Sequence, residues 1–276
     1  MFVDAINMAT AFTSPYVGLR RRANGEVFST IGTFIVVNAD GWILTSGHIV
    51  DEIQSCHGIE AGEASMETVA EEQRAGMVSE HLELWALPGF AESGLRLAEA
   101  HVNRIADIGL CRLDRFDPAS VRRYPVFRDS ARAPVEQGMS VCRLGFPFVE
   151  MPATFDESRG EFDLSSGSFP MPRFALDGMV SRFNRHFADD AASSALFIET
   201  STPGLRGQSG GPLLDVEGRV CGIQSHTSHL DLGFDAQYFI EGEIVLERQF
   251  LNVGVATHVD EVRALLDRVG VSHLVA

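Results

Sequence analysis

One serine of the sequence lies in a setting that suits a nucleophile. Residues 204 to 215 read GLRGQSGGPLLD, so Ser209 has glycine at positions 207, 210 and 211 around it. A nucleophilic serine needs a tight, exposed turn, in which its hydroxyl projects and nearby backbone N–H groups point at the oxygen that becomes negatively charged. Gly207 and Ser209 would provide these two N–H groups. A plain glycine-rich hairpin turn is the other interpretation of the same residues.

A serine hydroxyl is a weak nucleophile until a base accepts its proton, so a histidine and a carboxylate should accompany Ser209. His48 follows the apolar run GWILTS, with Gly47 turning the chain just before the imidazole. Asp107 stands at the start of another apolar run, in RIADIGLCRL. Taken alone, these are as readily a core histidine and a turn aspartate. Their order along the chain with Ser209 favours one site with three members.

The elements that would position these residues are mostly strands. Among 276 residues, 26 Gly and 11 Pro interrupt short apolar runs, a composition that favours a mostly β protein. Residues 31–46 predict a β-hairpin around the turn at 38–41. Further strands are predicted at 81–88, 105–113, 140–148, 175–183, 195–200, 211–225 and 250–256. A charged connection after residue 113 divides them into an N-terminal set, 15–115, and a C-terminal set, 131–257.

Other segments lack the strand pattern. Residues 51–80 have helical spacing with many acids and predict an inserted acidic helix. Residues 258–270 predict an amphipathic C-terminal helix, introduced by a capping-box-like Thr257 and Asp260. Residues 150–173 and 226–248 show no clear period and are predicted to be long surface loops. The whole chain, 1–276, is expected to form a single domain.

Charge and composition exclude several classes of function. The chain has 22 Lys and Arg against 38 Asp and Glu, a net charge of −16, which would repel nucleic acid and anionic membranes. The N-terminal residues resemble no export signal and no apolar run spans a bilayer, so a cytoplasmic location is expected. The cysteines Cys56, Cys111, Cys142 and Cys221 are scattered along the sequence, and we expect their thiols to be reduced. His226 and His229 with Asp231 give only a weak metal pattern, so neither a metal nor a cofactor is expected.

Together the motifs resemble those of the trypsin-like serine peptidases, and among them the bacterial HtrA-type branch. LTSGHIV is similar to the family's histidine motif, ADIGL to its aspartate motif and GQSGGP to its serine motif. Further similarity lies in LGFPF, DGMVS and DVEGRVCGI, so that it extends over about residues 30–257. No PDZ-like segment follows, and the acidic insertion is additional to the family pattern.

The resemblance implies two antiparallel six-stranded β-barrels with the active site between them. It implies a serine endopeptidase that cleaves protein or peptide substrates through an acyl-enzyme, with Ser225 supporting Asp107. Residues 222–227 would be the edge on which a substrate peptide adds as a strand. The substrate-binding residues would be Pro203, Gly204, Leu205, Arg206, Ser225, His226 and Thr227. No acid stands where trypsin has the one that gives its basic preference.

The sequence leaves two alternative functions open. One alternative is a catalytically silent, protease-like module that binds peptides. Another is a regulated intracellular protease that cleaves one partner, with an activating protein acting through the segments 150–173 and 226–248. Secreted relatives have an aspartate before the serine, which pairs with a newly cut N-terminus, whereas this chain has Gln208. We therefore expect that activity does not depend on cutting the N-terminus.

Overall fold

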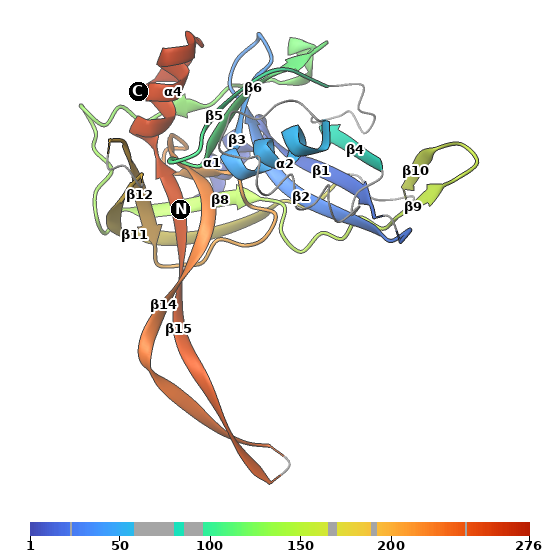
Figure 1. Ribbon diagram of the computed structural model, residues 1–276. Helices are drawn as coiled ribbons and strands as arrows, with labels where there is room; N and C mark the ends of the chain where they lie inside the picture. Colours follow the sequence, from blue (N-terminus) through green and yellow to red (C-terminus); the bar gives the residue numbers. More distant parts are fainter. Residues whose placement is uncertain (23, 58–79, 86–95, 165–169, 189–191, 241) are drawn as a thin grey trace.

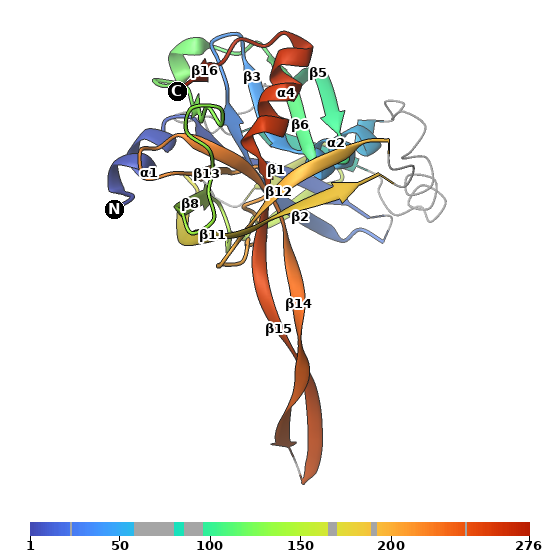
Figure 2. The same ribbon diagram turned by 90° about the vertical axis from the view of Figure 1, so that its left-hand side faces the viewer.

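The computed structural model describes residues 1–276 except 23, 58–79, 86–95, 165–169, 189–191 and 241, and it is drawn in Figures 1 and 2. It is built mainly of strands, which confirms the predicted mostly β fold. The first sheet has six antiparallel strands in the order β4-β1-β2-β3-β6-β5. These strands are β1 (Thr13–Arg21), β2 (Val27–Val36), β3 (Trp42–Ser46), β4 (Glu80–Trp85), β5 (Arg96–Asn103) and β6 (Ile108–Asp114).

The hairpin predicted at 31–46 is formed by β2 and β3. Its turn is set by Asn38, whose side-chain oxygen accepts hydrogen bonds from the backbone N–H groups of Asp40 (3.0 Å) and Trp42 (3.4 Å). Gly41 has a φ of +79°, which glycine adopts without strain. The turn fixes the pairing of Ile35 with Leu44, both fully buried, and so determines where β3 ends.

The second sheet has eight strands in the order β13-β8-β11-β12-β15-β14-β7-β16, two more than the six expected. The strands of this sheet include β7 and β16, each of which is only two residues long. The strands are β7 (Val126–Phe127), β8 (Ser140–Gly145), β11 (Phe174–Phe187), β12 (Ser194–Thr200), β13 (Pro212–Leu214), β14 (Val220–Ile240), β15 (Glu243–His258) and β16 (Leu274–Val275).

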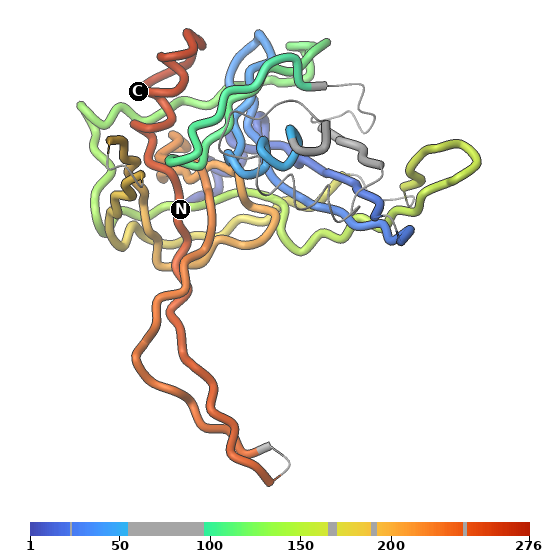
Figure 3. Tube along the Cα trace, viewed as in Figure 1, coloured from blue at the N-terminus to red at the C-terminus, as the bar shows by residue number. Residues whose placement is uncertain are grey.

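Both predicted loops contain strands. The prediction of a loop at 226–248 is wrong: β14 and β15 pair from Gly222–His258 to Ile240–Glu243 and form a long ribbon that projects from the body (Figures 1 and 2). The segment 150–173 is a loop only in part, because β9 (Ala153–Asp156) pairs with β10 (Glu161–Leu164). The trace in Figure 3 shows this small hairpin and the ribbon leaving the body in different directions.

Four short helices complete the described chain: α1 (Val3–Ala9), α2 (Gly47–His57), the 3₁₀ helix η1 (Pro118–Ser120) and α4 (Val259–Val269). The predicted C-terminal helix is confirmed as α4, although its N-cap is His258, whose Nδ1 accepts from the Asp260 N–H (3.2 Å). The predicted acidic helix at 51–80 overlaps the end of α2, and its remainder at 58–79 lies outside the described residues.

The core joins the two sheets. One cluster of buried side chains includes Phe34 and Leu110 from the first sheet, Phe197 and Ile223 from the second, and Leu265 from α4. Residues far apart in the sequence are therefore held against each other at the boundary between the sheets. In the described part of the chain, no helix is both long enough and apolar enough to cross a membrane.

Candidate active site

His48 is carried by the start of α2. Strand β3 ends at Ser46 and α2 begins at Gly47, so His48 is the second residue of the helix. A Cβ atom on Gly47 would lie 3.1 Å from the backbone nitrogen of Ile108 and 3.2 Å from Oδ1 of Asp107. Glycine at this position therefore allows the start of α2 to approach the turn that carries Asp107.

Asp107 lies in the turn between β5 and β6 with a φ of +49°, a left-handed conformation that aspartate tolerates better than most residues. Its Oδ1 accepts the backbone N–H of His48 (2.9 Å), and Nδ1 of His48 lies 3.1 Å from Oδ1 and 3.0 Å from Oδ2. The Ser225 hydroxyl donates to Oδ2. An ionised carboxylate only accepts hydrogen bonds, so Nδ1 of His48 carries a proton and Nε2 of the neutral ring is free to act as a base.

These contacts shift both pKa values. Burial disfavours the charged imidazolium, but the hydrogen bond and charge of Asp107, with smaller contributions from Glu52 and Asp51, outweigh it and raise the pKa of His48 above its usual value. Burial likewise disfavours the Asp107 carboxylate, yet the hydrogen bonds from His48 and Ser225 outweigh it and hold the pKa of Asp107 below its usual value. Asp107 is thus ionised at neutral pH and favours the protonated form of the histidine.

Ser209 lies in residues 204–211, which we call the serine loop. The loop is fixed to β2, because Oγ1 of Thr33 donates to the Gly207 carbonyl (2.7 Å) and the Thr33 N–H donates to the Ser209 carbonyl (2.8 Å). Gly207 has a φ of +97°, and a Cβ atom on Gly210 would overlap the Thr33 carbonyl oxygen. The glycines around Ser209 are therefore required by this backbone and by its close approach to β2.

The backbone N–H groups of Gly207 and Ser209 donate to no acceptor among the described residues, unlike that of Gln208, which donates to the Leu205 carbonyl (2.9 Å). Two neighbouring N–H groups without a protein acceptor can bind an oxygen that carries negative charge.

Ser225 connects the three predicted catalytic residues. Its hydroxyl donates to Asp107, and its carbonyl accepts the hydroxyl of Ser209 (3.0 Å). Among the described residues, no hydrogen bond joins Ser209 directly to His48. The structure thus brings all three to one junction between the sheets, with the serine hydroxyl turned toward Ser225.

The predicted specificity pocket is closed in this structure. Oγ1 of Thr227 donates to the Gly204 carbonyl (2.5 Å), which links the two sides of the pocket. Between them lies the buried Gln224, whose Nε2 donates to the His226 carbonyl (2.8 Å); a Cβ atom on Gly204 would overlap this nitrogen. Nothing in the sequence marks Gln224, because a glutamine within a strand gives no signal of the direction of its side chain.

Arg143 is a second residue that the sequence analysis missed. It is 1% exposed, and its guanidinium donates to the carbonyls of Thr202 (2.9 Å) and Pro203 (2.8 Å) and to the Thr200 hydroxyl. It makes no ion pair with any described residue, and burial lowers the pKa of Arg143 to about 10. A cation therefore lies beneath the backbone that forms one wall of the predicted pocket.

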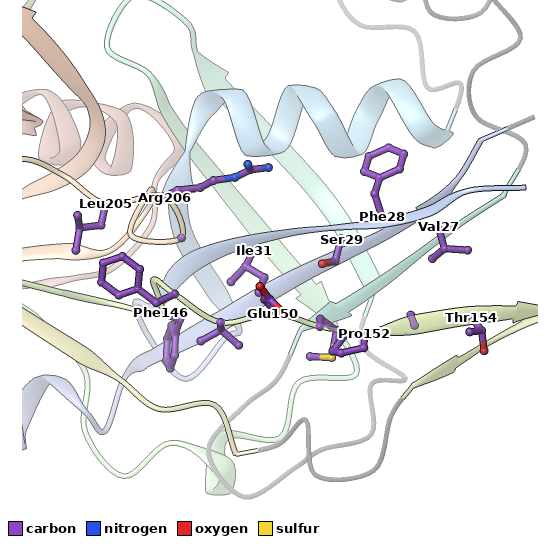
Figure 4. Close-up of a pocket in the computed structure, with 15 residues that line it drawn as sticks. Val27, Phe28, Ser29, Ile31, Phe146, Glu150, Pro152, Thr154, Leu205 and Arg206 are labelled. Atoms are coloured by element: carbon purple, nitrogen blue, oxygen red, sulfur yellow. The ribbon is translucent and has the colours of Figure 1, made fainter. Parts of the chain in front are cut away.

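Two clefts flank the junction. One, of about 800 Å³, is lined by Leu205 and Arg206 beside Phe146 and residues of β2, as Figure 4 shows. Gly207 belongs to the same lining. The other, of about 400 Å³, is lined by His48, Asp107, Ser225 and His226 with Phe197 and others. Leu205 and Arg206 thus lie in the cleft opposite the one that contains Ser225 and His226.

Other reactive side chains do not gather into a site. Cys111, Cys142 and Cys221 are buried free thiols, and burial raises the pKa of Cys142 to about 11 and of Cys221 to about 12. The side chain of Cys56 lies outside the described residues. In the described part of the chain, no three potential metal ligands cluster, and His229 instead contacts Asn252 (Nδ1 to Oδ1, 2.6 Å).

Comparison with known proteins places the chain in a class. It matches the family model of the trypsin-like peptidase domain over residues 32–223, well over half of its length. The chain belongs to this family, which makes it a serine protease in general type, and the match includes His48, Asp107 and Ser209. No curated protein matches the chain.

Proposed function

We propose that the protein is a serine endopeptidase with Ser209 as nucleophile, His48 as general base and Asp107 as the residue that orients the histidine. The observation that carries this proposal is the junction at Ser225, where the Asp107–His48 pair and the Ser209 hydroxyl bind to one residue. The backbone N–H groups of Gly207 and Ser209, which have no acceptor among the described residues, support the same proposal.

In the proposed reaction, Oγ of Ser209 attacks the carbonyl carbon of the scissile peptide bond while Nε2 of His48 takes the hydroxyl proton. The carbonyl oxygen becomes negative and is held by the N–H groups of Gly207 and Ser209. His48 then gives its proton to the amide nitrogen, the C–N bond breaks and the amine leaves. Water repeats the attack on the acyl-enzyme, again with His48 as base, and releases the acid. This chemistry uses no cofactor or metal.

The reaction requires one rearrangement. In the proposed reaction the Ser209 hydroxyl leaves the Ser225 carbonyl and turns toward Nε2 of His48 by rotation about its Cα–Cβ bond. A substrate strand along residues 225–227 would bring its own N–H to the Ser225 carbonyl and replace the serine there. Substrate binding would in this way produce the active arrangement.

A second candidate function is favoured by one observation. Because Ser209 points to Ser225 and the pocket is closed by Thr227 and Gln224, the same structure fits a catalytically silent module that binds peptides. The complete set of His48, Asp107 and Ser209 favours the enzyme. The motifs above favour the HtrA-type branch as its nearest relatives. We also propose that the protein acts in the cytoplasm. An activating protein would act by opening the pocket.

Labelling with a fluorophosphonate separates the two candidates, because this reagent reacts covalently with an activated serine. The wild type should be labelled, and Ser209→Ala should not. Ser140→Ala, in the same sheet and without a side-chain hydrogen bond in the described residues, is the matched control and should be labelled like the wild type. Absence of labelling in a folded wild type would favour the silent module.

A further inference from the structure

The ribbon formed by β14 and β15 beyond the body has no function in the reaction described above. We call its residues 228–252 the arm (Figures 1 and 2). Large apolar side chains of the arm are exposed, with Phe239 at 76% and Ile244 at 66%. The others are Leu232, Phe234, Tyr238, Val245, Leu246, Phe250 and Leu251. An isolated two-stranded ribbon is only marginally stable in water, so such a ribbon is expected to bind a further strand.

One edge of the arm begins at the nucleophile. Along β14, the edge opposite β15 pairs with β13 as far as Ile223. It then meets the serine loop, where the Gly210 N–H donates to the Gln224 carbonyl (2.8 Å) and Ser209 donates to the Ser225 carbonyl (3.0 Å). Past this point β15 is the only strand paired with β14 in the described part of the chain. An open strand edge therefore runs without interruption from Ser209 to the arm.

The register shows which residues face this open edge. Thr227 is paired with Gly254, whose N–H donates to the Thr202 carbonyl (2.9 Å) on the side away from β14. The pair is therefore not hydrogen-bonded across the ribbon, and Thr227 directs its own N–H and carbonyl to the open edge. Antiparallel alternation gives the same direction to His229 and Asp231, up to the irregularity between Asp231 and Asp235.

We propose that this edge binds the substrate segment that precedes the scissile bond, as a third strand of the arm; the proposal rests on the peptidase function proposed above. We count the substrate residues backwards from the scissile bond. If the first residue lies against Ser225, an antiparallel strand places the third residue against Thr227. The fifth then lies against His229 and the seventh against Asp231. The arm would thus extend recognition well beyond the residues next to the cut.

The chemistry of the arm defines the substrate class. Exposed aromatic and aliphatic side chains favour a strand rich in β-branched and aromatic residues, which pack best across strands. The arm carries five acids, Asp231, Asp235, Glu241, Glu243 and Glu247, against the single Arg248. At the upstream positions that face the arm, basic residues should therefore bind better than acidic ones. An unfolded or extended apolar segment fits this edge, because its backbone N–H and carbonyl groups are not already paired.

Two proline variants on the same rung of the ribbon test the proposal. His229→Pro removes an N–H from the open edge of β14. Asn252→Pro is the matched control, because Asn252 pairs with His229 and faces the opposite edge of β15. Both variants lose the His229–Asn252 contact, and neither loses a hydrogen bond between β14 and β15. His229→Pro alone also loses the ring contact between His229 and Phe250, so His229→Ala, which loses this contact but keeps the N–H, is measured beside it. A loss seen in His229→Pro and in neither of the other variants reports on the open edge of β14.

The substrates are found by letting the wild type cut a library of peptides from a digested proteome. One peptide that is cut is then synthesised with four and with eight residues upstream of the scissile bond. We expect kcat/KM of the wild type to rise on the order of tenfold with the longer peptide, as a few additional hydrogen bonds predict. His229→Pro should lose most of this gain and Asn252→Pro and His229→Ala should keep it, while fluorophosphonate labelling is equal in all four proteins.

Equal kcat/KM for both peptide lengths, or a loss that Asn252→Pro or His229→Ala shares equally with His229→Pro, would overturn the proposal for the arm. If the protein is instead a dimer that His229→Pro alone dissociates, the edge belongs to a second copy and the proposal is also overturned. A wild type that cuts no peptide of the library contradicts the peptidase function itself, which separates the two failures.

Discussion

The proposed catalytic groups of the first sheet and those of the second are held differently. In the first, His48 and Asp107 are joined by both the backbone and the side chain of the histidine, at 2.9 to 3.1 Å. In the second, the Ser209 hydroxyl binds a carbonyl of its own sheet, and Gln224 and Thr227 fill the pocket. In the proposed reaction, the His48–Asp107 pair is in place before substrate binds, whereas Ser209 and the pocket have to rearrange. We therefore expect any regulation of the proposed activity to act on the second sheet.

The largest expected effect comes from changing the pair that is already in place. Asp107→Asn keeps the size of the side chain but its amide can donate to Nδ1 of His48, which favours the wrong tautomer. We expect kcat/KM to fall by about 10⁴-fold with little change in thermal stability. Asp114→Asn, at an exposed carboxylate, is the control and should keep full activity. Full turnover by Asp107→Asn would mean that another carboxylate orients the histidine.

The same pair sets the pH dependence. A general base must be neutral, so kcat/KM should rise with pH through the pKa of His48, which lies above its usual value of 6.5. The residual activity of Asp107→Asn should rise at lower pH than that of the wild type, because the charge that raises this pKa is gone. A rising limb at the same pH in both proteins would show that His48 is not the group observed.

How far the sequence predicts this molecule depends on which faces of an element are buried. The hairpin at 31–46 is buried on both faces over most of its length, which gives two continuous apolar runs. Helix α4 buries one face, so its apolar residues repeat with the period of a helix. The arm buries neither face, and exposed apolar side chains such as Leu232, Phe239 and Ile244 occur along it without a regular period. Its strands are held by pairing with each other, which no local pattern records, and the sequence therefore predicted a loop.

In the candidate site, too, some residues can be predicted from local sequence and others cannot. The motifs at His48, Asp107 and Ser209 could be found because each needs small or special residues beside it, such as Gly47 and Gly207. Arg143 lies in the apolar run SVCRLG, and its charge predicts an exposed side chain. It is buried because the carbonyls of Thr202 and Pro203, distant in sequence, turn toward it. Such a partner is visible only in the folded chain.

A smaller effect should follow from Arg143 and concerns the residue before the scissile bond. The buried positive charge beneath Pro203, with no acid opposite it in the described residues, disfavours a basic side chain in the adjoining pocket. We expect peptides with Lys there to be cut on the order of tenfold more slowly than those with Leu. Arg143→Met should reduce this difference, and Arg143→Lys, which keeps the charge, should retain it. A cleavage profile dominated by Lys and Arg would contradict this.

The smallest expected effect is that of the N-terminus on the serine loop. A newly cut amino group can insert beside the serine only if a buried partner offsets the loss of its hydration. Gln208 is fully buried, but it is neutral, and its Oε1 already accepts the Leu205 N–H (3.0 Å). Met1 is 88% exposed and lies in a cleft with Arg128 and Asp215.

A chain with a cleavable N-terminal extension should therefore react with fluorophosphonate as fast as the same chain after the extension is removed at Met1. Removal of residues 1–14 would not be a clean comparison, because Ala5, Ala9 and Phe12 belong to the core. Comparing the extended and the cut chain leaves these contacts intact and changes only the free amine. A large gain in labelling rate on cutting would show that a terminal amine orders the serine loop despite Gln208. Equal rates would agree with the expectation that a free terminal amine does not order the serine loop.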